Sequence, residues 1–278
     1  GELAVATRTG ELGDGEACEA ADFDAPETLG GLIARIAPDV VVNAAAYTAV
    51  DRAETEPDAA YRANAESPHA LAEACARRDA LLVHYSPDYV FNGSGSRPYR
   101  EDDATDPLGV YGASKRAGEL AIQASGARHL IFRTAWVYAS HGRNFLLTML
   151  RLAADRDELR VVADQVGTPT SAALIADVTR DVLASSRLPS GIWHLTASGQ
   201  TSWHGFASAI MESARARGLL QRQPRVIPIT TEAFPTPARR PAYSCLDVSR
   251  LQMELGDELP EWRHGLGAVL DDLATRPA

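Results

Sequence analysis

Short apolar runs alternate with amphipathic stretches along the first half of the chain. The apolar runs cover residues 3–7, 39–46, 80–86 and 129–138, and apolar residues recur at helical spacing over 25–37, 58–78 and 114–125. Strands that are apolar on both faces and separated by helices indicate a parallel sheet covered on both sides. The pattern therefore predicts an α/β fold with a doubly wound, Rossmann-type parallel sheet.

The regularity weakens after residue 138, and proline becomes frequent in the stretch FPTPARRPAY (234–243). We predict a dinucleotide-binding domain over residues 1–140, joined by 171–197. A smaller, irregular α/β substrate-binding region over 141–278 is expected to be interleaved with it. In doubly wound folds ligands bind beyond the carboxyl ends of the strands, so the residues that follow each apolar run are the candidates for a site.

Small and polar residues follow these runs. Alanines after a strand allow a flat or extended ligand to approach the backbone, although they are equally compatible with close packing. The residues at or near the strand ends are Arg8, Asp22, Phe23, Ala44, Ala45, Ala46, Tyr47, Thr48, Tyr85, Ser86, Pro87 and Asp88.

The stretch VYGASKRAGE places Tyr111 and Lys115 four residues apart. On a helix this spacing puts both side chains on one face. A nearby ammonium lowers the pKa of a phenol from its ordinary value of about 10, so such a tyrosine can exchange a proton with a carbonyl oxygen while hydride reaches the carbon. Because a bare Tyr-x-x-x-Lys also arises by chance, it indicates reductase chemistry only in this context.

Composition narrows the classes of partner. The 278 residues carry a formal net charge of −10, which opposes binding to nucleic acid or to an anionic membrane surface. We find no signal peptide and no apolar run of the roughly 18 residues that cross a bilayer. Three widely spaced cysteines and no His pattern for zinc predict reduced thiols, a cytoplasmic location and no metal site.

Seven blocks resemble the extended short-chain dehydrogenase/reductase superfamily and, within it, the dTDP-4-dehydrorhamnose reductases. They span almost the whole chain in the order of that family, which makes the resemblance far more specific than Tyr-x-x-x-Lys alone. The blocks are RIAPDVVVNAAAYTAVDRAETEP (35–57), VHYSPDYVFNGSG (83–95), PYREDDATDPLGVYGASKRAGE (98–119), HLIFRTAWVYASHGRNFLLTMLRLA (129–153), VVADQVGTPT (161–170), GIWHLTASGQTSWHGFA (191–207) and FPTPARRPAYSCLD (234–247).

The resemblance implies hydride transfer from NAD(P)H to C4 of dTDP-4-dehydro-β-L-rhamnose. It makes Tyr111 the proton donor, and it makes Lys115 the residue that lowers the tyrosine pKa and contacts the nicotinamide ribose. The implied cofactor contacts are Asp22, Phe23, Ala46, Tyr47, Thr48 and Tyr85, and the implied substrate contacts are Asp88 and Trp136. From their place at the strand ends we add Ala44 and Ala45 as cofactor contacts and Ser86 and Pro87 as substrate contacts. Arg240, in the proline-rich block, is a candidate for binding the diphosphate of the substrate.

Two departures from the family keep other functions open. The glycine-rich loop G-x-x-G-x-x-G and the strand before it have no match, so we expect the numbering to begin after them. Pro87 stands where the family has a threonine, and it has no hydroxyl to offer the substrate carbonyl. The alternatives are another nucleotide-sugar 4-ketoreductase or epimerase, or a non-catalytic regulatory member of the family.

The residue after the second strand of a dinucleotide fold faces the adenosine ribose, where an acid favours NAD and an arginine accommodates the 2′-phosphate of NADP. This position reads Thr7-Arg8, with no acid. We therefore predict NADPH as the preferred cofactor, with NADH as the second choice. The sequence leaves a role for Mg²⁺ and a homodimer open.

Overall fold

The computed structural model describes residues 2–13, 15–185 and 188–276. In this part of the chain the main sheet has four parallel strands in the order β10 (Gly191–His194), β5 (His129–Thr134), β4 (Leu81–Pro87) and β3 (Val40–Asn43). Because the strands are parallel, their carboxyl ends meet at one edge of the sheet. The predicted α/β parallel architecture is confirmed.

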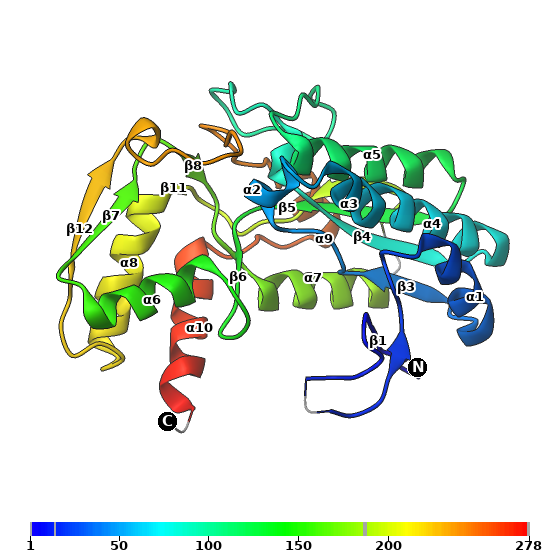
Figure 1. Cartoon of the computed structure of the whole chain (residues 1–278), viewed down its shortest axis with the longest axis horizontal. Helices are drawn as coiled ribbons and strands as arrows, with labels where there is room; N and C mark the ends of the chain where they lie inside the picture. The colour runs from blue at the N-terminus through cyan, green and yellow to red at the C-terminus, as the bar shows by residue number, and fades with distance from the viewer. Residues whose placement is uncertain (1, 14, 186–187, 277–278) are drawn as a thin grey trace.

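Helices cover both faces of the main sheet (Figure 1). On one face, α4 (Ser67–Arg78) and α5 (Val110–Ala124) bury Cys75 and Ile122 against Leu82 and Ile131. On the other face, α7 (Ala172–Ser185) packs Val178 and Val182 against side chains of β4 and β5, including Val83 and Phe132. Successive side chains along β4 and β5 therefore pack alternately against α4 and α5 on one face and against α7 on the other.

The predicted strand over residues 3–7 is wrong for its first three residues. Only β1 (Ala6–Thr7) is a strand, and it pairs with β2 (Glu19–Ala20) outside the main sheet. The run is apolar, but no sheet buries it, and Leu3 is 85% exposed. Helix α1 (Pro26–Ile36) follows β2 and packs against α4 through Leu29 and Leu71.

The predicted helix over 58–78 contains a π-helical turn. The chain runs through α2 (Val50–Ala53), α3 (Pro57–Tyr61) and η1 (Arg62–Glu66) before α4 begins. Pro68 has no N–H to donate to the carbonyl of Asn64, which favours a wider turn at this point. Gly118 of α5 approaches that carbonyl so closely that a Cβ there would lie 2.1 Å from it.

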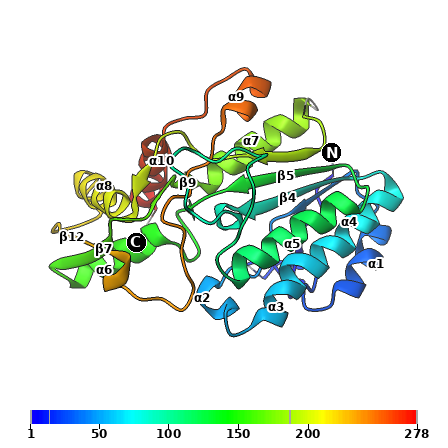
Figure 2. The same ribbon diagram turned by 90° about the horizontal axis from the view of Figure 1, so that it is seen from above.

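A second core lies beside the sheet (Figure 2). It joins α6 (Phe145–Asp155), α8 (Trp203–Ala216) and α10 (Trp262–Thr275) to the parallel pair β7 (Glu158–Val162) and β12 (Arg225–Ile229). Between these elements the chain returns to the main sheet as α7 and β10. The short elements are η2 (Asp88–Val90), β6 (Val137–Tyr138), β8 (Val166–Gly167), β9 (Thr170–Ser171), β11 (Thr201–Ser202), η3 (Thr231–Ala233) and α9 (Ser249–Leu255).

The proline-rich stretch after η3 and the residues that follow it pack against segments of the first half of the chain. Tyr99 and Leu246 form a bridge, and the backbone N–H of Ala238 donates to Asp51 at 3.2 Å. Gly93 lies against this stretch, and a Cβ there would come within 2.5 Å of Pro241. Within the described residues, no helix is long and apolar enough to span a membrane.

Candidate active site

Helix α5 presents the Tyr-x-x-x-Lys pair at the carboxyl edge of the sheet. Its first N–H, from Val110, donates to the Glu54 carboxylate at 2.9 Å, and a negative charge is favourable at a helix N-terminus. Gly112 allows the helix to lie on the Tyr89 carbonyl, since a Cβ there would approach the oxygen to 2.2 Å. The first turn of α5 is therefore held against η2.

Tyr111 lies edge-on to Tyr89, with ring centroids 5.5 Å apart. Burial raises its pKa above the ordinary value, and the nearby Asp88 and Tyr89 add to this effect. The direction is opposite to the one expected from Lys115. The phenol is therefore held in its protonated form in this structure, as a proton donor requires.

Lys115 is 2% exposed, and its Nζ lies 3.0 Å from Nε2 of the buried His84. Burial lowers the pKa of Lys115 to about 8, partly opposed by the charge of Glu119 one turn further along α5. The lysine is thus less charged than a surface lysine at neutral to alkaline pH.

Glu119 forms a bidentate ion pair with Arg133 of β5, at 2.9 and 2.7 Å, with both side chains at most 1% exposed. Burial raises the pKa of Glu119, but the hydrogen bond and charge of Arg133, together with Ser86 and Arg116, bring it below the ordinary value. Ser86 lies on the same face of β4 as His84, which is the face that α5 covers, and its Oγ is buried without a hydrogen-bond partner among the described residues. The strand runs extended through Pro87 at φ −88°, so it does not bend to redirect Ser86 toward a substrate.

Pro87 is paired in register with Thr134 of β5. Thr134 Oγ1 and Asp88 Oδ2 are buried and have no hydrogen-bond partner among the described residues. Burial raises the pKa of Asp88 to about 7, partly opposed by a hydrogen bond with Ser244. Unsatisfied buried polar groups are rare in folded proteins, and they call for a functional explanation. Both unpartnered groups neighbour Pro87, the position at which the sequence predicts the substrate carbonyl.

Five of the residues predicted for the cofactor follow β3 directly. Ala44, Ala45 and Thr48 are exposed, whereas Ala46 and Tyr47 are half-buried. Asn64 holds the Tyr47 backbone through hydrogen bonds of 2.8 and 3.0 Å. The exposed alanines leave room for a flat or extended ligand, as a dinucleotide requires.

The other predicted cofactor residues are spread more widely. Arg8 and Asp22 are exposed, while Phe23 packs against the cluster of α1 and α4. The Tyr85 hydroxyl lies 2.9 Å from Thr179 of α7, on the opposite face of the sheet from Lys115. The structure therefore does not bring Tyr85 and Lys115 together, and a cofactor contact by Tyr85 stays a prediction.

The two outer substrate residues are each held by a segment that is distant in the sequence. Trp136 adopts φ +48°, which interrupts the predicted strand 129–138, and its ring stacks on Trp203 with centroids 3.5 Å apart. A bulky residue in this conformation is a genuine outlier, which often marks a functional site. The Arg240 guanidinium lies 2.9 Å from Asp51 and donates to the Tyr89 hydroxyl at 3.1 Å.

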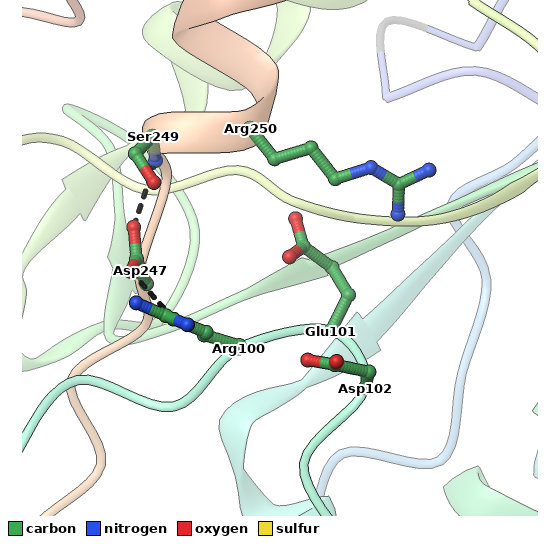
Figure 3. Close-up of a pocket in the computed structure, with 6 residues that line it drawn as sticks. All are labelled: Arg100, Glu101, Asp102, Asp247, Ser249 and Arg250. Carbon is green, nitrogen blue, oxygen red and sulfur yellow. Dashed lines mark hydrogen bonds and ion pairs between the residues drawn. The ribbon is translucent and has the colours of Figure 1, made fainter.

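A cavity of about 330 Å³ lies elsewhere, between the loop at Arg100 and α9 (Figure 3). Acidic and basic side chains both line it, and Arg100 approaches Asp247 to 3.5 Å. Its lining residues are Arg100, Glu101, Asp102, Asp247, Ser249 and Arg250, all outside the predicted site. Among the described residues, no three His, Cys, Asp or Glu side chains are arranged to hold a metal ion. We therefore assign no ligands for Mg²⁺.

Sequence reasoning missed the polar residues that support Lys115 and Tyr47. Asn43, His84 and Asn64 are at most 4% exposed, and each hydrogen-bonds a residue of another segment. The available signal was the alternation along β4, which places His84 on the face covered by α5. Nothing in the sequence identified its partner.

Comparisons with known proteins match one family over nearly the whole chain. A model of the RmlD substrate binding domain matches residues 3–275. A dTDP-4-dehydrorhamnose reductase of Burkholderia thailandensis is 50% identical over 265 residues, which are 92% of this chain and 89% of that protein.

Two solved structures share the fold. A dTDP-4-dehydrorhamnose reductase of Clostridium acetobutylicum has a TM-score of 0.85 at 39% identity, covering 91% of this chain and 87% of the other. The Bacillus anthracis reductase in complex with NADP has a TM-score of 0.84 at 35% identity, covering 90% and 86%. With sequence and structure in agreement, the chain belongs to the RmlD substrate binding domain family, that of the dTDP-4-dehydrorhamnose reductases.

Proposed function

We propose that this protein reduces dTDP-4-dehydro-β-L-rhamnose to dTDP-L-rhamnose with NADPH. The observation that carries the proposal is the position of Tyr111, which lies beside the buried carboxyl of Asp88 at the carboxyl edge of a parallel sheet. Exposed alanines after β3 open the same edge to a dinucleotide. The NADP complex of the Bacillus anthracis relative supports the choice of cofactor.

The bound nicotinamide would supply the hydride that reaches C4 of the sugar. Tyr111 would donate its phenolic proton to the carbonyl oxygen, so that the ketone becomes a secondary alcohol. Lys115 lies one turn further along α5 and would contact the nicotinamide ribose. Asp88, Trp136 and Arg240 would orient the sugar nucleotide, together with Pro87 at the end of β4.

We also propose a division of labour along the chain. Residues 1–140 and 171–197 would bind the dinucleotide, and the remainder of 141–278 would bind the sugar nucleotide. The return of α7 and β10 to the main sheet supports this interleaving. The free thiols of Cys18, Cys75 and Cys245 are consistent with a cytoplasmic location. A homodimer stays a prediction that sedimentation would test.

The test is the loss of NADPH absorbance at 340 nm when the 4-keto sugar nucleotide is added to the full-length protein. Formation of dTDP-L-rhamnose supports the reductase. Consumption of a different 4-keto sugar nucleotide, but not of this one, would point to a related ketoreductase. Binding of both ligands without any turnover would favour a regulatory role.

Replacing Arg8 by alanine should remove the preference for NADPH over NADH. Arg8 is exposed directly after β1, where its guanidinium could pair with the 2′-phosphate. The measurement is the ratio of kcat/KM for the two cofactors. Arg78→Ala is the matched control, since Arg78 is an exposed arginine at the end of α4, before β4 begins. An unchanged ratio in Arg8→Ala would discard this assignment.

Replacing Pro87 by threonine should raise turnover, by no more than about 10²–10³, the usual contribution of one well-placed oxyanion donor. The reason is the missing hydroxyl beside Tyr111. Thr134 of β5 is paired with Pro87 of β4, and its buried hydroxyl has no hydrogen-bond partner among the described residues. In the native protein this hydroxyl can donate part of the hydrogen bonding that the substrate carbonyl needs. Pro87→Val is the control, because valine has the shape of threonine without its hydroxyl. Equal turnover of the two variants would contradict the prediction.

A further inference from the structure

Three polar side chains from different segments form a buried chain of hydrogen bonds that ends at Lys115. Asn43 closes β3, His84 lies in β4 and Lys115 in α5, and they are 4%, 0% and 2% exposed. Asn43 Nδ2 lies 3.0 Å from His84 Nδ1, and His84 Nε2 lies 3.0 Å from Lys115 Nζ. The proposed mechanism gives no role to Asn43 or His84.

The partners of Asn43 set the direction of this chain. The backbone N–H of Ala45 donates to Asn43 Oδ1 at 3.0 Å, so the amide NH₂ of Asn43 must face the imidazole. His84 Nδ1 therefore accepts a hydrogen bond. A neutral imidazole carries one proton, which then sits on Nε2 and points at Lys115.

An ammonium has three donors and no acceptor, whereas a neutral amine has a lone pair. The Nε2–H of His84 can donate to Lys115 Nζ only when the lysine is neutral. If Lys115 were charged, its ammonium would face the Nε2–H of His84, which is also a donor. Turning the Asn43 amide over would remove this conflict, but the Ala45 N–H would then lose its acceptor. The arrangement thus satisfies the Ala45 N–H, Asn43 Oδ1 and both His84 ring nitrogens only when Lys115 is a neutral amine.

We propose that Asn43 and His84 are positioning residues for Lys115, and that the direction of their hydrogen bonds favours its neutral amine in the free protein. The inference rests on the proposed function only where it links Lys115 to catalysis. Composition adds support, because the sequence holds 27 lysine and arginine residues and Lys115 is the only lysine. Arginine cannot lose its proton in proteins, so it could not take this place in the chain.

The charged groups around Lys115 do not set its protonation state in place of Asn43 and His84. Glu119 raises the pKa of Lys115, but it is itself paired with Arg133 from β5 and Arg116 from α5. From η2, Asp88 acts on Tyr111. From η1, the uncharged Asn64 donates to Ser114, the residue before Lys115 on α5. His84 is the group in direct contact with Nζ, and it decides whether a proton there is tolerated.

Asn43→Asp tests the direction of the chain. A carboxylate accepts from both Ala45 N–H and His84 Nδ1–H, so the imidazole proton moves to Nδ1 and Nε2 becomes an acceptor for the lysine ammonium. In NMR titrations with ¹³C-labelled lysine, the resonance is assigned by its loss in Lys115→Arg. The wild-type midpoint is expected at about 8, and Asn43→Asp should raise it by at least about one unit.

His84→Gln is the second variant, because a glutamine can turn its amide oxygen toward the ammonium and should also raise the midpoint. Asn144→Asp makes the same amide-to-carboxyl change at the N-cap of α6, where it should leave the midpoint in place. Unchanged midpoints in folded Asn43→Asp and His84→Gln proteins would overturn the proposal, and His84→Gln decides alone if Asn43→Asp does not fold.

The kinetic readout is the pH profile of kcat/KM. If the charged lysine is the active form, the profile falls above the Lys115 midpoint, and Asn43→Asp extends activity to higher pH. If Asn43 and His84 had only a structural role, their replacement would lower kcat/KM at every pH without shifting the pH at which it falls. Because the NMR titration needs neither cofactor nor substrate, failure of the proposal is distinguishable from failure of the reductase assignment.

Discussion

Replacing Tyr111 by phenylalanine should lower kcat by about 10²–10⁴, the range typical of a lost general acid. The phenylalanine ring can keep the edge-on contact with Tyr89, so the fold and the affinity for NADPH should change little. Burial, Asp88 and Tyr89 all raise the pKa of Tyr111. The phenol is therefore suited to proton donation in the direction of reduction.

The measurements are steady-state turnover and NADPH binding by fluorescence. Tyr89→Phe is the matched control: it removes a neighbouring phenolic hydroxyl, which accepts from Arg240 at 3.1 Å, and should act mainly on KM for the sugar nucleotide. Near-native turnover of Tyr111→Phe would reject Tyr111 as the proton donor. Loss of NADPH binding in this variant would instead indicate a structural defect.

Replacing Asp88 by asparagine should stabilise the protein at alkaline pH while impairing catalysis. Burial raises the pKa of Asp88 from 3.8 to about 7. The carboxyl thus contributes stability that is fully present below pH 3.8, and that is lost as the pH rises through the folded value of about 7. This rise of about three pKa units corresponds to about 4 kcal/mol. That value is the upper limit of the increase in the free energy of unfolding when the uncharged amide replaces the carboxyl.

The free energy of unfolding of Asp88→Asn and of the native protein should therefore agree near pH 4 and diverge up to about pH 7, with a constant difference above it. Urea denaturation at several pH values measures this difference. Asp155→Asn, an exposed aspartate at the end of α6, should stay within about 0.5 kcal/mol of the native protein. A gain that does not depend on pH would contradict the titration of Asp88.

The elements predicted with success are those in which local pattern and burial agree. The runs at 80–86 and 129–138 became β4 and β5 because their side chains are buried between α5 and α7. The run at 3–7 has the same apolar character, yet only Ala6 and Thr7 pair with another strand. Strand formation depends on a partner, which an apolar run alone does not supply.

The sequence by itself determined the alternation of strands and helices, the face of α5 that carries Tyr111 and Lys115, and the family resemblance. These follow from spacing along the chain, because helical and strand periods are local properties of the backbone. Only the tertiary structure decided that Lys115 meets His84, 31 residues earlier, and that His84 meets Asn43, 41 residues before it. It also decided the raised pKa of Tyr111, because burial and the charges of distant segments depend on how the whole chain packs.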